Sequence, residues 1–331
     1  MFSIGVDIGG SHISSCAYSH EDKTLCRETF SYKKINSQGT KEEILTGWVD
    51  ALQTTIQGLG KPISGIGVAM PGPFDYYNGI SKITDVEKLQ SLYDVNLRLE
   101  LADRLKIQPS QIRFINDATA FSVAEALIGK ASKYKKAIAI TLGTGLGSSF
   151  LLNGKPIIKD KQVPEGGFLY NQYYQNVFAD DLFSTRGIIN AFEEETGKRL
   201  KNVKELCELV DVDPNARKVF NDFGIRLVDF INPYIEEFEA DVLVFGGNIS
   251  KAFEFFGPAL KDALKGVDEI YVSEFGEEAA IMGSALLLDE HYYAGISETL
   301  RCSIIFLMSS TEIGSTPAKG SSNKIKSSPD N

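Results

Sequence analysis

The sequence predicts an α/β protein folded as two lobes, and three observations support this. The chain has 331 residues, of which 43% are hydrophobic, and a single hydrophobic core seldom grows beyond about 250–300 residues. Segments with the two-residue period of strands alternate with segments that repeat every three to four residues, as helices do. A strand followed by a glycine-rich turn also occurs twice, which indicates a duplicated unit.

Apolar patterns predict the individual elements. Apolar side chains alternate from Phe2 to Ile8, whereas Lys135–Leu142 is almost continuously apolar after its lysines, as is typical of a buried strand. Further strands are expected at Ile63–Ala69, Ile112–Ile115, Asp241–Phe245 and Glu269–Ser273. Helices are expected around two apolar series, Ile44, Trp48, Leu52, Ile56 and Val219, Phe223, Leu227.

Charge and length limit the partners and the location of the protein. The net charge is −10 and the pI is near 5.0, so nucleic acid and anionic membranes would repel the chain. We expect neither as a partner and expect a small-molecule substrate. The N-terminus enters a predicted strand rather than a signal peptide, and the apolar segment Cys302–Met308 is shorter than the roughly 20 residues that cross a bilayer. We therefore expect a cytoplasmic protein.

The glycine turns are candidate phosphate sites. Ile4–His12 and Ile138–Leu146 each contain a strand, a glycine turn and the start of another strand. The backbone N–H groups of Gly9, Gly10 and Gly145 can approach phosphate oxygens because no side chain shields them. Each turn alone is explained equally well as an ordinary hairpin turn. Two such hairpins in a duplicated α/β chain are how actin-like ATPases hold a nucleotide.

Residues beside the first turn extend this hypothesis. Ser11 can add a hydroxyl donor to a phosphate. Asp7 precedes the turn, and we expect it to hold Mg²⁺ through water, because this ion prefers oxygen ligands and keeps much of its hydration shell. Neither turn matches GxxxxGK[ST], so the protein is not a P-loop enzyme.

Two further motifs follow predicted strands. Asn116 and Asp117 come directly after Ile112–Ile115, at a strand end where ligands gather in α/β sheets. Asp117 is the best-placed carboxylate to accept a proton during phosphoryl transfer, although capping of the following helix would also explain it. Asp241–Ile249 leads through two glycines into a helix, either as a tight turn or as a surface for adenine and ribose.

Taken in chain order, these motifs closely resemble the ROK family, named for repressors, open reading frames and kinases. The resemblance covers roughly residues 2 to 290 and rests on Asp7–Gly10, Pro71–Pro73, Asn116–Ala118, Gly143–Gly147, Glu165–Gly167 and Gly246–Asn248. ROK proteins have a two-lobed actin-like (ribonuclease H-like) ATPase fold with a duplicated βββαβα unit. Many are ATP-dependent kinases of hexoses or N-acetylhexosamines, so the resemblance implies a glucokinase-like sugar kinase that uses ATP and Mg²⁺.

The resemblance also implies roles for individual residues. Asp117 would be the general base and Asn116 a sugar ligand. Further expected sugar contacts are Gly72, Asp117 itself, Glu165 and Asp180. The expected nucleotide contacts are Gly9, Gly10, Ser11, Thr144 and Gly145 at the phosphates, and Gly246, Gly247 and Asn248 at the adenosine.

The lobes and the assembly follow from the same resemblance. We expect a small lobe over residues 1–117, completed by a C-terminal helix near residues 277–292, and a large lobe over residues 118–276. ROK kinases are often dimers, which implies a homodimer. From Ser309 the chain is rich in Ser, Gly, Lys and Pro, and such a segment buries too little apolar surface to offset its ordering entropy. We expect residues 309–331 to form a disordered tail.

The sequence departs from the family in one segment. Most members carry a cysteine-rich zinc segment after the ExGH pattern, but here Phe168 replaces the zinc-binding histidine and no cysteine occurs from Leu169 to Ala179. Structural zinc needs about four N or S ligands, so we expect no zinc. Counting back four residues from Ser184 places Asp180 where the family has a second sugar-binding glutamate. Asp181 is an equally good candidate.

Two alternatives to a kinase remain open. A catalytically inactive sugar sensor is suggested by the missing zinc segment. A ROK-type repressor is less favoured, because such repressors carry a winged-helix domain ahead of the first hairpin, which here starts at Phe2 in an acidic chain. The sequence also leaves open which sugar and which hydroxyl are used, and whether polyphosphate replaces ATP.

Overall fold

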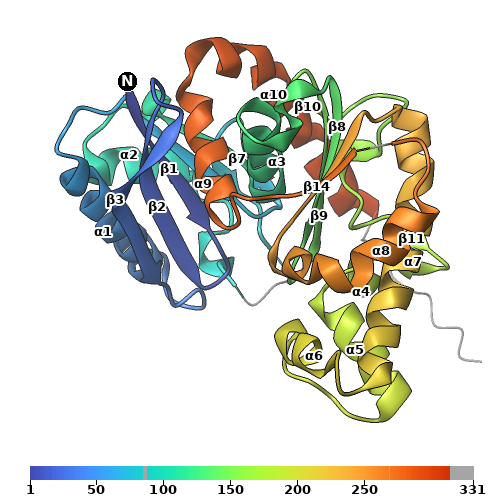
Figure 1. The fold of residues 1–331 in the computed structure, drawn as a ribbon. Helices are drawn as coiled ribbons and strands as arrows, with labels where there is room; N and C mark the ends of the chain where they lie inside the picture. The colour runs from blue at the N-terminus through green and yellow to red at the C-terminus, as the bar shows by residue number, and fades with distance from the viewer. Residues whose placement is uncertain (85–87, 268, 314–331) are drawn as a thin grey trace, which may run out of the picture.

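The computed structural model of the chain describes residues 1–84, 88–267 and 269–313, with side chains as far as Cys302 in the last helix. Its long strands form two five-stranded sheets that lie side by side in Figure 1. The first sheet contains β1 (Phe2–Ile8), β2 (His12–Ser19), β3 (Thr24–Lys34), β4 (Ile66–Met70) and β7 (Ile112–Asn116). The second contains β8 (Lys136–Leu142), β9 (Leu146–Leu152), β10 (Lys155–Ile157), β13 (Val242–Gly246) and β14 (Glu269–Val272).

The two sheets have the same topology. The strand order is β3-β2-β1-β4-β7 in the first sheet and β10-β9-β8-β13-β14 in the second. In each sheet the first three strands pair antiparallel, and the last two add in parallel on the other side of the first strand. Because the connections match strand for strand, the predicted duplication of an α/β unit is confirmed.

The strands expected from apolar patterns are all present, although some begin or end a few residues away. β3 was not expected, because its side chains are mostly exposed or half-buried and show no apolar alternation. It pairs with β2 over much of its length and lies at the edge of the first sheet. Hydrogen bonding to β2, rather than burial, therefore forms this strand.

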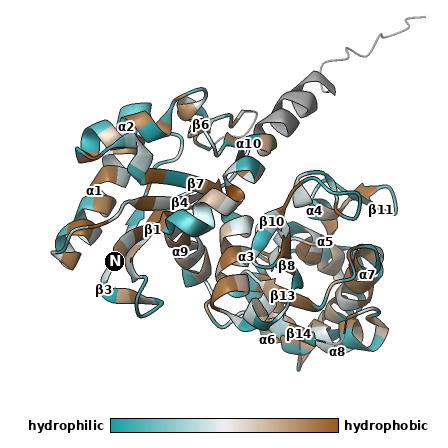
Figure 2. Cartoon of the chain, turned by 90° about the horizontal axis from the view of Figure 1, so that it is seen from above, coloured by the Kyte–Doolittle hydropathy of each residue, from teal (hydrophilic) through white to brown (hydrophobic). Residues whose placement is uncertain are grey.

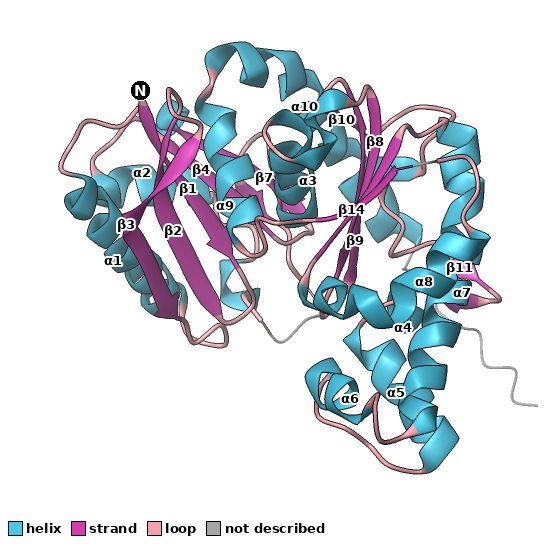
Figure 3. Cartoon of the chain, viewed as in Figure 1, coloured by secondary structure: helices cyan, strands magenta, loops and turns pink. Residues whose placement is uncertain are grey.

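Two central helices pack between the sheets. These are α3 (Asp117–Leu127) and α9 (Glu278–Ala285), which contact each other, while α9 also contacts β1 and β4 (Figure 3). A Cβ at Gly283 of α9 would lie 1.8 Å from the carbonyl oxygen of Ala120 in α3, and one at Gly67 of β4 would lie 1.8 Å from the carbonyl oxygen of Ser284. Helix and sheet backbones therefore touch on both sides of α9. The lobe boundary near residue 117 and the assignment of α9 to the first lobe stay predictions.

The second sheet separates two apolar clusters. Ala137 and Ala139 of β8 face α3, α9 and the first sheet. Ile138 and Ile140, one residue out of phase, face the other way, toward α7 (Pro214–Phe238). Figure 2 shows hydrophobic residues along the strands and on the helix faces turned toward them. Since this sheet is covered on both faces, its strands are apolar throughout.

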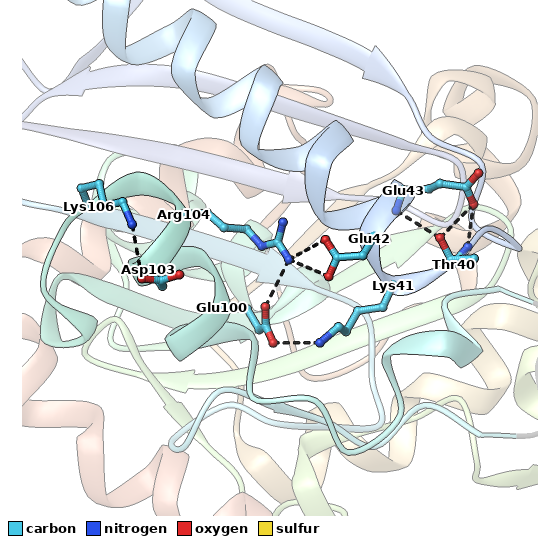
Figure 4. Close-up of polar contacts among 8 residues, drawn as sticks. All are labelled: Thr40, Lys41, Glu42, Glu43, Glu100, Asp103, Arg104 and Lys106. Atoms are coloured by element: carbon cyan, nitrogen blue, oxygen red, sulfur yellow. Dashed lines mark hydrogen bonds and ion pairs between the residues drawn. The ribbon is translucent and has the colours of Figure 1, made fainter.

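Two outer helices cover the first sheet, and polar contacts fix their ends. In α1 (Lys41–Leu59), Thr40 and Glu43 form a capping box. In α2 (Leu97–Leu105), Arg104 donates to both carboxylate oxygens of Glu42 at 2.9 Å. Figure 4 shows these contacts together with the 3.0 Å ion pair between Lys41 and Glu100. The network links the start of α1 to two half-buried side chains of α2.

The remaining elements are short helices, two hairpins and the C-terminal helix. They are α4 (Ala179–Leu182), α5 (Thr185–Thr196), α6 (Val203–Leu209), α8 (Phe253–Ala263), α10 (Glu290–Ile313), the hairpins β5 (Phe74–Asp75) with β6 (Ile80–Ser81) and β11 (Tyr173–Tyr174) with β12 (Val177–Phe178), and short 3₁₀ turns. Helix α10 includes the first residues of the predicted tail, and residues 314–331 lie outside the described part of the chain. None of the described helices has the length and apolar character needed to cross a membrane.

Candidate active site

Three neighbouring parallel strands end at one edge of the first sheet. In the register, Asp7 of β1 pairs with Ala69 of β4, and Met70 of β4 pairs with Asn116 of β7. The carboxyl ends of parallel strands meet at the same edge, where ligands bind in α/β sheets. Asp7, the loop that holds Gly72, and Asn116 with Asp117 therefore lie at one edge of the sheet.

Asn116, and not Asp117, is the residue that caps helix α3. The sequence had offered capping as an alternative role for Asp117. Its side-chain oxygen accepts the N–H of Thr119 at 3.1 Å, which makes Asn116 the N-cap of α3. Asp117 is the first residue of the helix, and its Oδ1 accepts the N–H of Ala118 at 2.8 Å and Nδ2 of Asn116 at 3.0 Å. Both hydrogen bonds use Oδ1, and no side chain among the described residues donates to Oδ2. Asp117 thus accepts one N–H of the first helical turn, but the N-cap position belongs to Asn116.

The carboxylates at this edge repel one another. Burial, followed by the charges of Asp117 and Glu277, raises the pKa of Asp7 to about 7. Burial also raises the pKa of Asp117, while its hydrogen bonds with Ala118 and Asn116 act in the opposite direction. A divalent cation would relieve this repulsion. A single carboxylate beside a glycine turn fits a hydrated Mg²⁺ ion, which keeps several of its waters.

Tyr76 belongs to the site, and sequence reasoning missed it. Its hydroxyl donates to the carbonyl oxygen of Met70 at 3.0 Å and accepts Nδ2 of Asn116 at 3.3 Å. A Cβ at Gly72 would lie 3.3 Å from the same hydroxyl. Burial and then the charge of Asp117 raise the pKa of Tyr76, so the phenol stays protonated. The Tyr76 hydroxyl therefore contacts both the side-chain amide of Asn116 and the loop that holds Gly72.

The second glycine turn is built from Gly143 to Gly145. The N–H of Gly143 donates to the carbonyl oxygen of Gly145 at 3.0 Å. The Gly143 carbonyl oxygen in turn accepts the backbone N–H of Thr185 at 2.8 Å and its hydroxyl at 3.0 Å. Thr144 and Gly145 are exposed. Thr185, at the start of α5, therefore holds the turn through two hydrogen bonds. The tip of the turn stays accessible to a ligand.

The diglycine of Gly246 and Gly247 lies beside the second turn. β13 and β8 are parallel neighbours, with Gly246 opposite Thr141. Gly247 has φ +81°, and a Cβ there would lie 2.3 Å from the carbonyl oxygen of Leu142. A glycine is required on both counts. Asn248 follows as an exposed residue that starts a 3₁₀ turn, so these two predicted nucleotide motifs share one sheet edge.

Asp180 holds the second turn together. Its Oδ1 accepts the N–H of Leu146 at 2.7 Å, and its Oδ2 pairs with Arg186. Asp181 pairs with the same Arg186 at 2.7 Å. Both carboxylates predicted as sugar ligands therefore have protein partners. Their assignment to the sugar stays a prediction.

Glu165 lies on the protein surface. Glu165 is exposed on a 3₁₀ turn and lines a surface hollow with residues 158–163. Within the described residues, no hydrogen bond or ion pair joins it to Asn116 or Asp117. Nor does that part of the chain group three His, Cys, Asp or Glu side chains as a metal site. The sugar contact of Glu165 and the lack of zinc stay predictions.

Comparison with known proteins decides the family. The model of the ROK family matches residues 3–291. The chain belongs to the ROK family. It is 25% identical over 325 residues to an N-acetyl-D-glucosamine kinase of Haemophilus influenzae, covering 86% of this chain and 98% of the relative. It is also 26% identical over 319 residues to a glucokinase of Thermotoga maritima, covering 87% and 97%.

Solved structures of ROK proteins share the fold. A ROK hexokinase from Thermus thermophilus superposes with a TM-score of 0.72 at 20% identity, over 90% of this chain and all of that one. A ROK family glucokinase from Streptomyces griseus, solved with glucose and AMPPNP, superposes with a TM-score of 0.68 at 17% identity, over 87% and 99%. This chain therefore has the two-lobed actin-like ATPase fold of the family.

Proposed function

We propose that this protein is an ATP-dependent sugar kinase that phosphorylates a hexose or an N-acetylhexosamine. The observation that carries the proposal is Asp117, whose Oδ1 is held by Asn116 and Ala118 while Oδ2 is left to a substrate. Its raised pKa makes it a stronger base than an exposed aspartate. Relatives whose names specify N-acetyl-D-glucosamine and glucose kinases support the substrate class.

Proton transfer and phosphoryl transfer occur at the edge of the first sheet. Asp117 Oδ2 accepts the proton of the sugar hydroxyl as the hydroxyl oxygen bonds to the γ-phosphorus of ATP. The bond from that phosphorus to the bridging oxygen breaks, and ADP leaves with the electron pair. Phosphoryl transfer of this kind depends mainly on positioning and charge stabilisation. Tyr76 contributes by fixing the amide of Asn116, the expected sugar ligand.

The two glycine turns are the expected donor site. Gly9, Gly10 and Ser11 follow Asp7 at the first sheet, while Thr144 and Gly145 form the exposed tip of the second turn. In the proposal these residues lie at the phosphates, and Gly246 to Asn248 contact the adenosine. The N–H of Gly9 donates to the carbonyl oxygen of His12 at 3.0 Å, so Gly10 supplies the backbone N–H of the first turn. Asp7 would hold Mg²⁺ through water, and the ion would neutralise charge on the phosphates.

An ATP-coupled assay over a panel of hexoses and N-acetylhexosamines tests the proposal. We expect turnover with at least one sugar, with ³¹P NMR locating the new phosphate ester. Asp117→Asn should abolish this turnover while sugar binding, measured calorimetrically, is retained. Measurable sugar binding without turnover for any sugar would instead support the inactive sensor. Substituting polyphosphate for ATP in the same assay identifies the donor, and light scattering tests the predicted homodimer.

A further inference from the structure

A lysine side chain lies over the first glycine turn. A Cβ at Gly10 would be 2.8 Å from Cδ and 3.1 Å from Nζ of Lys88. The two residues are far apart in sequence, and Lys88 belongs to none of the motifs that indicated the function. The ammonium group occupies the space that the missing side chain of Gly10 leaves open.

The backbone next to Lys88 is held firmly. Leu89 is 2% exposed, so its side chain is anchored in the core beneath the first sheet. Its N–H donates to the carbonyl oxygen of Ser37 at 2.7 Å. Leu89 also has φ +60°, a conformation that a non-glycine residue keeps only where its surroundings impose it, and one that clusters at ligand sites. Lys88 is therefore directed to the turn by a fixed neighbour.

The ammonium group of Lys88 has no ion-pair partner among the described residues. No described carboxylate forms an ion pair with its Nζ, whereas Lys82 on the same loop pairs with Asp94 at 2.5 Å. The carboxyl groups of Asp7 and Asp117 lie at the same edge of the first sheet, at the ends of β1 and β7. A polyphosphate entering here needs compensating positive charge, and an unpaired ammonium supplies it at the turn.

We propose that Lys88 binds the phosphates of the nucleotide donor at the first glycine turn. Nζ would donate to a phosphate oxygen that the N–H of Gly10 also approaches, while the N–H of Gly9 closes the turn by donating to the carbonyl oxygen of His12 at 3.0 Å. This inference rests on the proposed function, because it identifies a further binding residue of the same site. It assigns Lys88 to the phosphate donor rather than to the sugar.

Steady-state kinetics of Lys88→Gln and Lys88→Arg test the assignment. A hydrogen bond to a charged group is worth enough that Lys88→Gln should lower kcat/KM for ATP by about 10- to 100-fold. The KM for sugar at saturating ATP should not change. Lys88→Arg keeps the charge and should retain most of the activity. Lys82→Gln is the matched control, since it removes the same charge from the same loop, and it should behave as wild type.

Nucleotide binding separates this inference from the proposed function. Calorimetry with MgATP, in the absence of sugar, should show the same loss of affinity in Lys88→Gln, and circular dichroism checks that the variant is folded. If wild type binds MgATP but phosphorylates no sugar, the proposed function fails while this comparison still decides the role of Lys88. Unchanged MgATP affinity, a change in the sugar KM alone, or no binding of MgATP by wild type would each overturn the inference.

Discussion

Asn116 donates a side-chain N–H to the carboxylate of Asp117 across 3.0 Å, while its own side-chain oxygen accepts the N–H of Thr119 at 3.1 Å. Asn116 is therefore the last residue of strand β7, and its side chain both caps helix α3 and orients the carboxylate of Asp117. The hydroxyl of Tyr76 contacts the same amide at 3.3 Å. The site is thus supported by hydrogen bonds that leave Asp117 Oδ2 available.

Asp117→Asn should remove catalysis without removing the fold. Asparagine keeps the shape of the side chain but cannot accept the substrate proton, so kcat should fall by about 100- to 10,000-fold. Because burial disfavours the ionised carboxylate, the variant should be at least as stable as wild type. Stopped assays and thermal unfolding measure the two quantities. Turnover close to that of wild type would show that another group takes the proton.

Asn116→Ser should separate the capping role from the positioning role. Serine is a good N-cap, so the free energy of unfolding should stay near that of wild type. It lacks the amide that donates to Asp117, and kcat should therefore drop. Asn116→Ala loses both functions and should also lose about 1 kcal/mol of stability. If the serine variant were as active as wild type, the hydrogen bond between Asn116 and Asp117 would have no catalytic role.

Asp7 should make stability fall as pH rises. Its pKa is raised from 3.8 to about 7 in the fold, so between these values the folded protein holds a proton that the unfolded chain has released. Stability from this group is complete below pH 3.8 and is lost as pH rises through 7. Asp7→Asn cannot ionise and should exceed wild type in stability at neutral pH by up to about 4 kcal/mol.

Denaturant unfolding of wild type and Asp7→Asn across this pH range measures the difference. It should be small in acid and grow toward neutral pH. Added Mg²⁺ should reduce the difference at neutral pH, because a bound cation favours the ionised carboxylate of Asp7 and stabilises only wild type. A difference that is the same at every pH would contradict the raised pKa.

Gly283→Ala should strongly destabilise the protein. A Cβ at this position would lie 1.8 Å from the Ala120 carbonyl oxygen, so α3 and α9 must separate to admit it. Overpacking of this kind costs about 1–3 kcal/mol or more. Gly58→Ala in α1 is the matched control, since its Cβ would have only ordinary contacts, at 3.7 Å, and alanine favours helix. Equal unfolding free energies for the two variants would disprove the close crossing.

Thr40→Ala should weaken the start of α1. The Thr40 hydroxyl accepts the N–H of Glu43 at 3.3 Å, and the Glu43 carboxylate accepts the N–H of Thr40 at 2.7 Å. Loss of an N-cap costs about 1 kcal/mol, which chemical denaturation resolves. Thr40→Ser retains the hydroxyl and should stay near wild type. Catalysis should be unaffected in both variants, because this network lies on the outer surface.

Local patterns in the sequence determined the α/β class, the main strands, the glycine turns and the residues that follow them. Two-residue periodicity and glycine turns depend on neighbouring residues, so they are visible without the fold. The repeated hairpin also predicted the duplication, which the matching strand orders of the two sheets confirm. Asn116 and Asp117 were found because both follow one strand directly.

Only the tertiary structure decided how distant segments share the site. It assigns the capping role to Asn116, ties Asp180 to Leu146 and Arg186, and brings Lys88 to Gly10. The contacts of Asp180 and Lys88 join residues on different elements, and neither spacing nor composition carries information about them. Whether a carboxylate caps a helix, pairs with an arginine or faces a substrate depends on which backbone and side-chain groups the packed sheets and helices place beside it.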